Sequence, residues 1–158
     1  MPYMAIEKPR NKDLKSIEKV LEQWTDPEEV KKYLIRVNSE IKGKTEYSMN
    51  FWIIKKEDLV VGIGGLAETL TIILPLAKTN RPGEIKILYI SNKYRNKGFG
   101  KQMINFLENE AKNQNYKELF IRSAKRYKDT AYNFYKKMGY KNLCKLDNNM
   151  AVFYKLLK

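Results

Sequence analysis

A basic, glycine-containing segment from Tyr94 to Lys101 has the clearest potential for chemistry in this chain. It reads Tyr94-Arg95-Asn96-Lys97-Gly98-Phe99-Gly100-Lys101 and lies between an expected strand and an expected helix. The start of a helix offers unpaired N–H groups and a partial positive charge, which favour a bound anion. Glycine adds room for a phosphate to approach the backbone closely. The pattern predicts a phosphate-binding loop, and an ordinary basic turn before a helix is the alternative.

The residue types that are missing exclude several classes of site. The chain has no histidine and a single cysteine, Cys144. Ser-His-Asp and Cys-His nucleophile pairs, histidine metal sites, intrachain disulfides and thiolate zinc sites are therefore excluded. We interpret Cys144 as a small strand residue, because no histidine is available to stabilise a thiolate. No metal is expected.

Length and composition indicate one globular domain. The chain has 158 residues, of which 43% are apolar and 12% aromatic, enough for a hydrophobic core. The N-terminus lacks the long apolar region of a signal peptide, and the longest apolar stretch, 59–67, is shorter than a membrane span. We expect a soluble, cytoplasmic protein.

The net charge of +13 would attract polyanions, including nucleic acid. The basic residues are spread along the chain without a block of five, which is typical of a solvated surface. The aromatic residues Trp24, Tyr47, Phe51 and Trp52 are interpreted as core or cleft residues, although single-strand binders stack bases on such side chains. A nucleic-acid or ribosome-binding module therefore stays an alternative function.

Hydrophobic periodicity predicts the element order β-α-α-β-β-β-α-β-α-β-β. Asp13 and Asp26-Pro27 begin two helices, and Gly43 ends the second. Asp129 is expected to cap the last helix, and the β-branched stretch 68–78 is strand-like until Pro75. The remaining strands are expected at 5–8, 50–55, 59–66, 84–91, 119–124, 140–145 and 150–156, with a helix after Gly100. The strand-helix-strand segment from Glu84 to Ala124 implies a parallel pair, and the hairpins imply antiparallel strands. The fold class is therefore α/β with a mixed sheet and helices on both faces.

A second glycine pattern is a poor candidate for dinucleotide binding. Gly62-Ile63-Gly64-Gly65-Leu66-Ala67 fits the letters G-x-G-x-x-A. That fingerprint has to open a helix, whereas the residues that follow are β-branched and stopped by Pro75. We interpret these glycines as places where another backbone or a ligand passes close to a strand.

Arg95-x-x-Gly98-x-Gly100 resembles the pyrophosphate-binding loop of the GNAT N-acetyltransferase superfamily. The strand 84–90 resembles the family's fourth strand, and the segment 131–140 resembles its late helix, Ala-x-x-x-Tyr-x-x-x-Gly-(Phe/Tyr). The resemblance is good from about Asn50 to Leu156 and rests on element order before Asn50. It implies a mostly antiparallel twisted sheet with a splayed parallel strand pair. It also implies one acetyltransferase domain over 1–158, with acceptor-side helices in 1–49 and an acetyl-CoA-binding core in 50–156.

The resemblance implies that acetyl-CoA is the co-substrate. Its pantetheine would pair with the edge of the fourth strand in the manner of β-augmentation, where a backbone N–H can polarise the thioester carbonyl. Its diphosphate would lie on the loop amides, and Asn133 is a further contact candidate. The cofactor-binding residues are thus expected to be Leu88, Tyr89, Ile90, Arg95, Asn96, Lys97, Gly98, Phe99, Gly100, Lys101 and Asn133.

Two catalytic residues follow from the same resemblance. Glu84 matches the position of a glutamate base, and a base acting through water is the alternative. Tyr135 matches the tyrosine that protonates the leaving CoA sulfur, although it also lies on the apolar stripe of its helix, where a tyrosine is usually packed. Lys128 stands where many members have asparagine, so its role is open.

The expected function is transfer of an acetyl group from acetyl-CoA to a primary amine, by direct attack in a ternary complex. A GNAT fold that binds CoA without catalysis is a further alternative. The acceptor, a small molecule or a protein, is not identified by the residues. We expect a monomer or homodimer, without membrane partners and with nucleic acid disfavoured.

Overall fold

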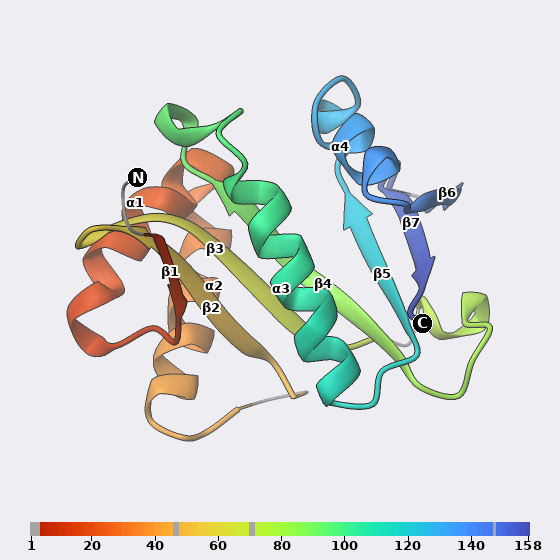
Figure 1. Cartoon of the computed structure of the whole chain (residues 1–158), viewed down its shortest axis with the longest axis horizontal. Coiled ribbons are helices and arrows are strands. Elements are labelled where there is room, and N and C mark those ends of the chain that lie inside the picture. The colour runs from red at the N-terminus through yellow and green to blue at the C-terminus, as the bar shows by residue number, and fades with distance from the viewer. Residues whose placement is uncertain (1–3, 46–47, 70–71, 147) are drawn as a thin grey trace. The chain divides into compact units, whose positions relative to one another are not determined.

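The computed structural model describes residues 4–45, 48–69, 72–146 and 148–158. Tyr47, predicted to line the core or a cleft, lies outside these residues. The helices and strands follow the predicted order along the chain (Figure 1). Their bounds are β1 Met4–Glu7, α1 Leu14–Trp24, α2 Pro27–Ile41, β2 Asn50–Lys56, β3 Leu59–Glu68, β4 Pro82–Ile90, α3 Phe99–Asn113, β5 Glu118–Ser123, α4 Ala131–Lys137, β6 Lys141–Lys145 and β7 Ala151–Leu156.

The strands form one sheet in the order β1-β2-β3-β4-β5-β7-β6. β4 and β5 are parallel, with Glu84 opposite Phe120. The pairs β1–β2, β2–β3, β5–β7 and β6–β7 are antiparallel. The predicted mixed α/β sheet with one parallel pair is confirmed.

The chain divides into two compact units, and β4 and α3 each contribute to both. The first unit comprises 1–67 and 87–107, and the second comprises 68–86 and 108–158. The predicted single acetyltransferase domain over 1–158 stays a prediction.

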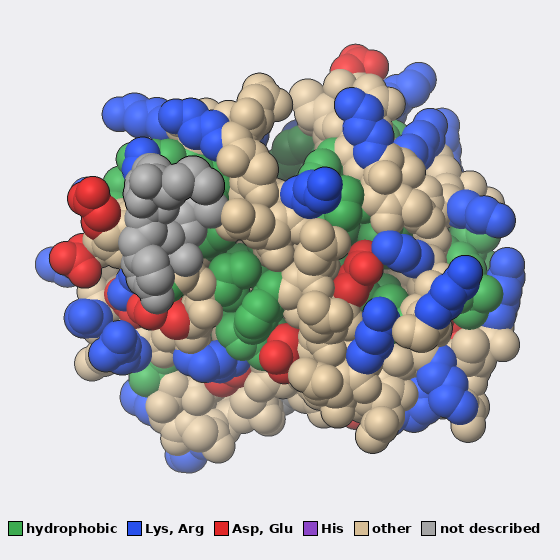
Figure 2. Space-filling view, in the orientation of Figure 1, with side chains coloured by type: hydrophobic (Ala, Val, Ile, Leu, Met, Phe, Trp, Pro, Cys, Tyr) green, Lys and Arg blue, Asp and Glu red, His purple; other side chains and the backbone are tan. Residues whose placement is uncertain are grey.

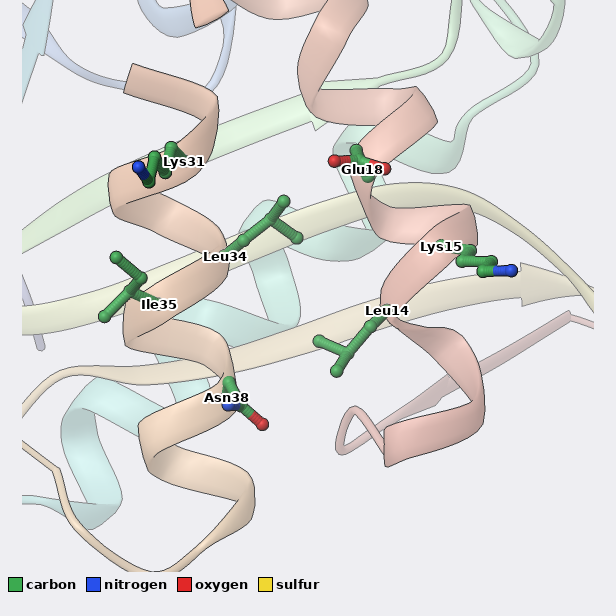
Figure 3. Close-up of a pocket in the computed structure, with 7 residues that line it drawn as sticks. All are labelled: Leu14, Lys15, Glu18, Lys31, Leu34, Ile35 and Asn38. Carbon is green, nitrogen blue, oxygen red and sulfur yellow. The ribbon is translucent and has the colours of Figure 1, made fainter. Parts of the chain in front are cut away.

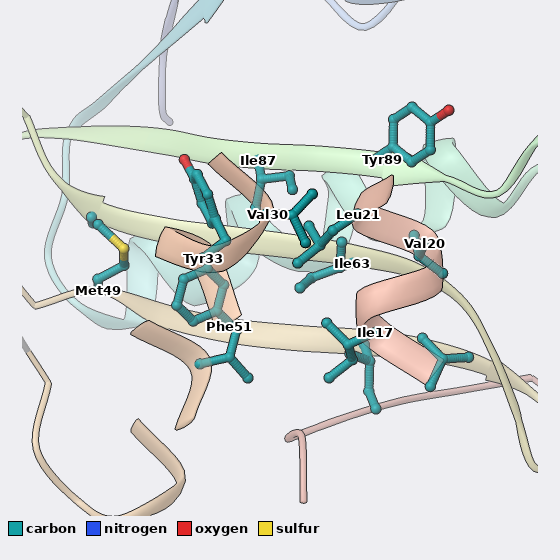
Figure 4. Close-up of a cluster of buried hydrophobic side chains, with 14 residues drawn as sticks. Ile17, Val20, Leu21, Val30, Tyr33, Met49, Phe51, Ile63, Ile87 and Tyr89 are labelled. Carbon is teal, nitrogen blue, oxygen red and sulfur yellow. The ribbon is translucent and has the colours of Figure 1, made fainter. Parts of the chain in front are cut away.

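In the first unit, helices cover both faces of the sheet (Figure 1). One face packs against α1 and α2 through a buried cluster that includes Ile17, Leu21 and Val37 from the helices and Phe51 and Ile63 from the strands (Figure 4). The opposite face packs against α3, where the ring of Phe106 lies 5.6 Å from that of Trp52. Trp52 and Phe51 are buried, which confirms their interpretation as core residues.

The glycines of β3 let α3 lie close to the sheet. A Cβ added to Gly64 would lie 2.8 Å from Met103 Sδ and 3.0 Å from Leu107 Cδ1. No α-helix opens in the described residues after these glycines, because β3 continues to Glu68 and a short 3-10 turn follows at Leu74–Leu76. The rejection of a dinucleotide fingerprint is confirmed, and its glycines serve packing.

A buried ion cluster joins the first two strands to the start of α1. Lys55 Nζ lies 2.8 Å from Glu7 Oε1 and 2.9 Å from Asp13 Oδ1. Burial raises the pKa of Asp13, but hydrogen bonds from Lys55 and from the Arg10 amide outweigh burial, so the pKa lies below its ordinary value. Burial lowers the pKa of Lys55, and its bonds to the two carboxylates outweigh that, so its pKa is raised.

Two helix boundaries follow the sequence signals. Asp26 Oδ1 accepts a hydrogen bond of 2.9 Å from the Glu29 amide and caps α2, whose first residue is Pro27. Gly43 ends this helix with a positive φ of 78°.

In the second unit, β5 and β7 carry a smaller core that includes Phe120, Val152 and Tyr154. Buried Glu118 accepts hydrogen bonds of 2.8 Å from the Lys78 amide and 2.6 Å from the Thr79 amide. This carboxylate fixes the segment before β4 to the start of β5.

Two local predictions are wrong. The described part of 68–78 is not a strand beyond Glu68, because Pro75 and the turn at Leu74–Leu76 remove ladder hydrogen bonds there; residues 70–71 lie outside the described part. Asp129 does not cap α4, whose N-cap is Thr130 without a side-chain cap.

Candidate functional site

The end of β4 carries the residues predicted to pair with pantetheine. Tyr89 and Ile90 are buried, and Leu88 is half-buried. The Tyr89 hydroxyl donates to the Gln23 carbonyl and to Asn92 Oδ1, both at 3.2 Å. This strand end is thus held firmly within the first unit.

The loop after β4 turns twice through left-handed backbone conformations before α3 begins. Asn96 has a φ of 61° and Gly98 a φ of 87°, and Phe99 is the first residue of α3. A Cβ added to Gly98 would meet no atom within 4 Å, so the space above it is open. Left-handed residues directly before a helix aim backbone N–H groups at a common point, which suits an anion. The amides of 96–101 can therefore bind a phosphate or diphosphate.

The basic side chains of this loop have different surroundings. Arg95 Nε donates to the Ile90 carbonyl at 3.2 Å, and its guanidinium lies 4.9 Å from the Tyr89 ring centroid. Arg95 therefore braces the loop against β4. Lys97 Nζ lies 5.8 Å from the Tyr94 ring, and Lys101 is exposed. The lysines add positive charge around the loop amides.

Gln23, which sequence reasoning missed, fixes the start of this loop from α1. Its Oε1 accepts hydrogen bonds of 2.9 Å from the Asn92 amide and 3.3 Å from Ser91 Oγ. The contact spans 69 residues in the sequence. No local pattern marks it.

Glu84 is buried in the second unit, with 1% of its surface exposed. Its Oε2 lies 2.9 Å from Arg122 Nε and 3.3 Å from Lys86 Nζ. Its Oε1 is buried and has no hydrogen-bond partner among the residues that the structure describes. The two cations were missed, although an arginine directly after the apolar run Leu119–Ile121 indicates a buried partner.

Tyr135 lies on α4 with its ring packed between aromatic side chains. Its ring centroid is 5.4 Å from that of Phe153 and 6.4 Å from that of Tyr140. Burial raises the pKa of Tyr135, and the nearby Tyr127 adds to the effect. The hydroxyl therefore stays protonated at neutral pH and can donate a proton or hydrogen bond.

Asn133 and Lys128 are exposed. The Asn133 amide nitrogen donates to the Asp129 carbonyl at 3.5 Å, a contact within its own turn of chain. Its cofactor role and the role of Lys128 stay predictions.

The predicted site residues fall into two groups. The structure brings those from 88–101 together in the first unit, on β4, the loop and the first turn of α3. Glu84, Asn133 and Tyr135 belong to the second unit, on β4 and α4. Their catalytic and binding roles stay predictions.

A separate groove of about 310 Å³ lies between α1 and α2 (Figure 3). Leu14, Leu34 and Ile35 give it apolar walls, and Lys15 and Lys31 lie at its sides. None of its lining residues belongs to the predicted site, so it is not the predicted cofactor site.

The described ranges lack two further features. They contain no group of three or more Cys, Asp or Glu side chains that could hold a metal ion. In those same ranges, no helix combines the length and apolar character that crossing a membrane requires. Lys and Arg side chains are spread over the visible face, with fewer Asp and Glu among them (Figure 2).

Comparison with known proteins agrees with the fold. Residues 48–142 match the family profile described as acetyltransferase (GNAT) domain. No curated protein matches the sequence.

Solved structures are similar over almost the whole chain. An acetyltransferase of the GNAT family from Staphylococcus aureus Mu50 has a TM-score of 0.77 at 17% identity, covering 99% of this chain and 100% of that one. PaiA N-acetyltransferase from Thermoplasma acidophilum, in complex with coenzyme A, has a TM-score of 0.73 at 15% identity, with coverages of 98% and 99%. Ard1 from Thermoplasma volcanium has a TM-score of 0.75 at 17% identity, with 98% of each chain covered. At these identities the likeness shows the fold.

Proposed function

Because the chain belongs to the acetyltransferase (GNAT) family, we propose that it transfers an acetyl group from acetyl-CoA to a primary amine in a ternary complex. The observation that carries the proposal is the turn directly before α3, in which Asn96 and Gly98 both have left-handed backbone conformations. The space beside Gly98 is open, so a phosphate can approach the backbone there. This turn provides backbone donors for a diphosphate without a histidine or a metal. The PaiA structure, which is similar in fold, contains coenzyme A.

Acetyl-CoA would be held mainly by backbone. The amides of 96–101 bind the diphosphate, Lys97 and Lys101 add charge, and Arg95 keeps the loop in place through the Ile90 carbonyl. Pantetheine pairs with Leu88, Tyr89 and Ile90 as an added strand, and a backbone N–H there stabilises the oxyanion. Such contacts depend little on salt, unlike phosphate neutralisation by lysines alone.

The chemical step needs a neutral amine and a protonated leaving group. An alkyl ammonium with a pKa of about 10.4 loses a proton to Glu84 or to water. The amine nitrogen then attacks the thioester carbon, forming the C–N bond, and the C–S bond breaks as the tetrahedral intermediate collapses. Once the base has passed the first proton to solvent, the nitrogen releases its second proton to it. Tyr135 gives its proton to the CoA sulfur and regains one from solvent. Amide and free CoA are the products.

Two observations support these assignments. Oε1 of Glu84 is buried without a partner in the described part of the chain, so it can accept a hydrogen bond from a water or an amine. The Tyr135 hydroxyl, whose pKa burial raises, is protonated at neutral pH, as a general acid has to be. A base acting through water is the alternative to Glu84.

Calorimetry with acetyl-CoA at low and high salt tests cofactor binding. Desulfo-CoA and linear polyphosphate are the controls, since a chain of charge +13 binds many anions weakly. We expect acetyl-CoA binding that persists at high salt and that polyphosphate does not reproduce. Binding that disappears with salt would contradict the proposal and favour a polyanion-binding module.

Release of free CoA, measured with a panel of amines, tests transfer itself. Spermine, kanamycin, Nα-acetyl-lysine and a tetrapeptide with a free N-terminus cover the acceptor classes. Turnover with one of them supports the enzyme. Tight acetyl-CoA binding with no turnover would instead support a fold that binds CoA without catalysis.

A further inference from the structure

Three polar contacts converge on Glu108, a mostly buried carboxylate in the second half of α3. Its side chain is 12% exposed. The Tyr140 hydroxyl donates to its Oε2 at 2.9 Å, and Lys155 Nζ lies 3.0 Å and 3.1 Å from its two oxygens. Charge-assisted bonds of this kind, shielded from water, are strong and hold their partners in a narrow range of positions.

The same lysine reaches the end of α4. Lys155 Nζ donates to the Met138 carbonyl at 2.8 Å, and Met138 is the C-cap of α4. Gly139 follows with a φ of 93°, and a Cβ added there would lie 3.4 Å from Lys155 Cε. Lys155 therefore lies directly against the turn that ends the helix.

That turn holds the backbone of Tyr135. The amides of Met138 and Tyr140 donate to the Tyr135 carbonyl at 3.1 Å and 3.0 Å. The Tyr140 ring lies 6.4 Å from the Tyr135 ring. The N-cap, Thr130, makes no side-chain cap bond. Tyr132 anchors the first turn of this seven-residue helix through the Ser123 carbonyl, and Lys155 anchors its C-terminal end through the Met138 carbonyl.

We propose that Glu108 is a positioning residue for the reaction, which holds Tyr135 in place through Lys155, Tyr140 and the turn at 138–140. The proposal rests on the proposed function, in which Tyr135 protonates the CoA sulfur. Glu108 itself touches no reacting atom. A misplacement of about 1 Å can lower a rate by about a hundredfold, so a network that fixes this helix end affects turnover.

Kinetics of the full chain test the inference. Glu108→Gln keeps the side-chain shape and removes the charge that holds Lys155, and Lys155→Met removes the bond to Met138 while leaving the Glu108–Tyr140 bond. Glu110→Gln, two residues along α3, makes the same change of charge and is the matched control. Free CoA release is measured with the amine that the wild-type chain acetylates fastest, and amide hydrogen exchange is followed over 131–140.

We expect kcat to fall by about tenfold in Glu108→Gln and Lys155→Met, with KM for acetyl-CoA within twofold of the wild-type value. Exchange at 136–140 should become several-fold faster. Glu110→Gln should match the wild type in all three measurements. If Glu108 only stabilised the fold, the variants would have a smaller folded fraction, but the folded protein would keep both the kcat and the KM of the wild type.

Tyr140→Phe keeps the ion pair and is a milder variant if Glu108→Gln does not fold. It should lower kcat by a smaller factor, again without a change in KM. An active wild-type chain whose Tyr140→Phe, Lys155→Met and folded Glu108→Gln forms all keep their kcat would overturn this inference alone. Unchanged exchange at 136–140 would overturn it as well. A wild-type chain that binds no acetyl-CoA would overturn the proposed function and this inference together.

Discussion

Arg122 Nε lies 2.9 Å from Glu84 Oε2, and the carboxylate of this pair is buried whereas the arginine side chain is 22% exposed. Lys86 approaches the same oxygen at 3.3 Å, whereas Oε1 has no hydrogen-bond partner within the described ranges. The ion pair thus occupies one side of the carboxylate and leaves the other available. A base at this position would act through Oε1.

Glu84→Gln tests this arrangement. The change removes the carboxylate from Lys86, which is buried, and from Arg122, which is partly buried, so we expect the free energy of unfolding to fall by about 3 to 5 kcal/mol. If Glu84 is the base, kcat of the folded variant falls by about a hundredfold or more. Urea unfolding and the rate of CoA release, normalised to folded protein, measure the two effects. A folded variant with kcat within twofold of wild type would assign the base role to water.

Tyr135→Phe removes the proposed acid and keeps the packed ring. We expect kcat to fall by about a hundredfold or more, with KM for acetyl-CoA little changed, because the hydroxyl acts on the leaving sulfur. Tyr132→Phe, on the same helix, is the control: its hydroxyl donates to the Ser123 carbonyl at 3.1 Å, so its loss should affect stability and not turnover. Equal rates for wild type and Tyr135→Phe would refute the acid role.

The pH dependence of the fold should also reflect Tyr135. Burial first, and then Tyr127, raises its pKa, so the neutral form is favoured in the folded state. Its stabilisation is complete below the unfolded pKa of about 10 and is lost as the pH rises through the folded pKa. The loss of stability above about pH 10 should therefore be smaller in Tyr135→Phe, as urea midpoints at several pH values would measure. If the urea midpoints of the wild type and Tyr135→Phe fell equally as the pH rises above about 10, this effect of Tyr135 on stability would be contradicted.

Gly98 and Gly43 form a matched pair for testing the loop. Both have a positive φ, of 87° and 78°, and a Cβ added to either would meet no atom within 4 Å. Alanine at each position should therefore cost about 1 to 2 kcal/mol of stability through backbone strain alone. Only Gly98→Ala should also weaken acetyl-CoA binding, because it changes the turn that aims the amides at the diphosphate. Equal affinities of the two variants in calorimetry would remove the loop from the cofactor site.

Gly64→Ala tests the packing of α3 on β3. The added methyl would lie 2.8 Å from Met103 Sδ, so we expect about 1 to 3 kcal/mol of destabilisation. In a Met103→Ala background the cost of Gly64→Ala should be smaller, because the clash is with that side chain, and a double-mutant cycle in urea measures the coupling. Independent effects of the two changes would show that α3 moves away as a whole.

The sequence predicted those parts of the site that depend on neighbours in the chain. The loop from Arg95 to Gly100 and the helix that it opens are a local pattern, so their conformation follows from glycine positions and helix termini. The same holds for the hairpin of β2 and β3. The predicted cap, Asp129, is one residue away from the observed N-cap, Thr130, because both residue types cap helices and residue type alone does not decide between neighbours.

The contacts that could not be predicted join residues far apart in the sequence. Arg122 and Glu84 are 38 residues apart, Glu108 and Lys155 are 47 apart, and Gln23 and Asn92 are 69 apart. Each depends on strand order and on which way a helix faces. A charged residue within an apolar run, such as Arg122, indicates that a buried partner exists without indicating which one.

The order of strands in the second unit has a consequence for how the chain is made. β7 follows β6 in the sequence but lies between β5 and β6 in the sheet. Until residues 151–156 have left the ribosome, β5 has an unpaired edge beside Phe120 and Ile121, and β6 has no place in the sheet. An open apolar edge is a template for other chains. A chain that stops before Ala151 should therefore aggregate during synthesis, even though most of its site residues are already present.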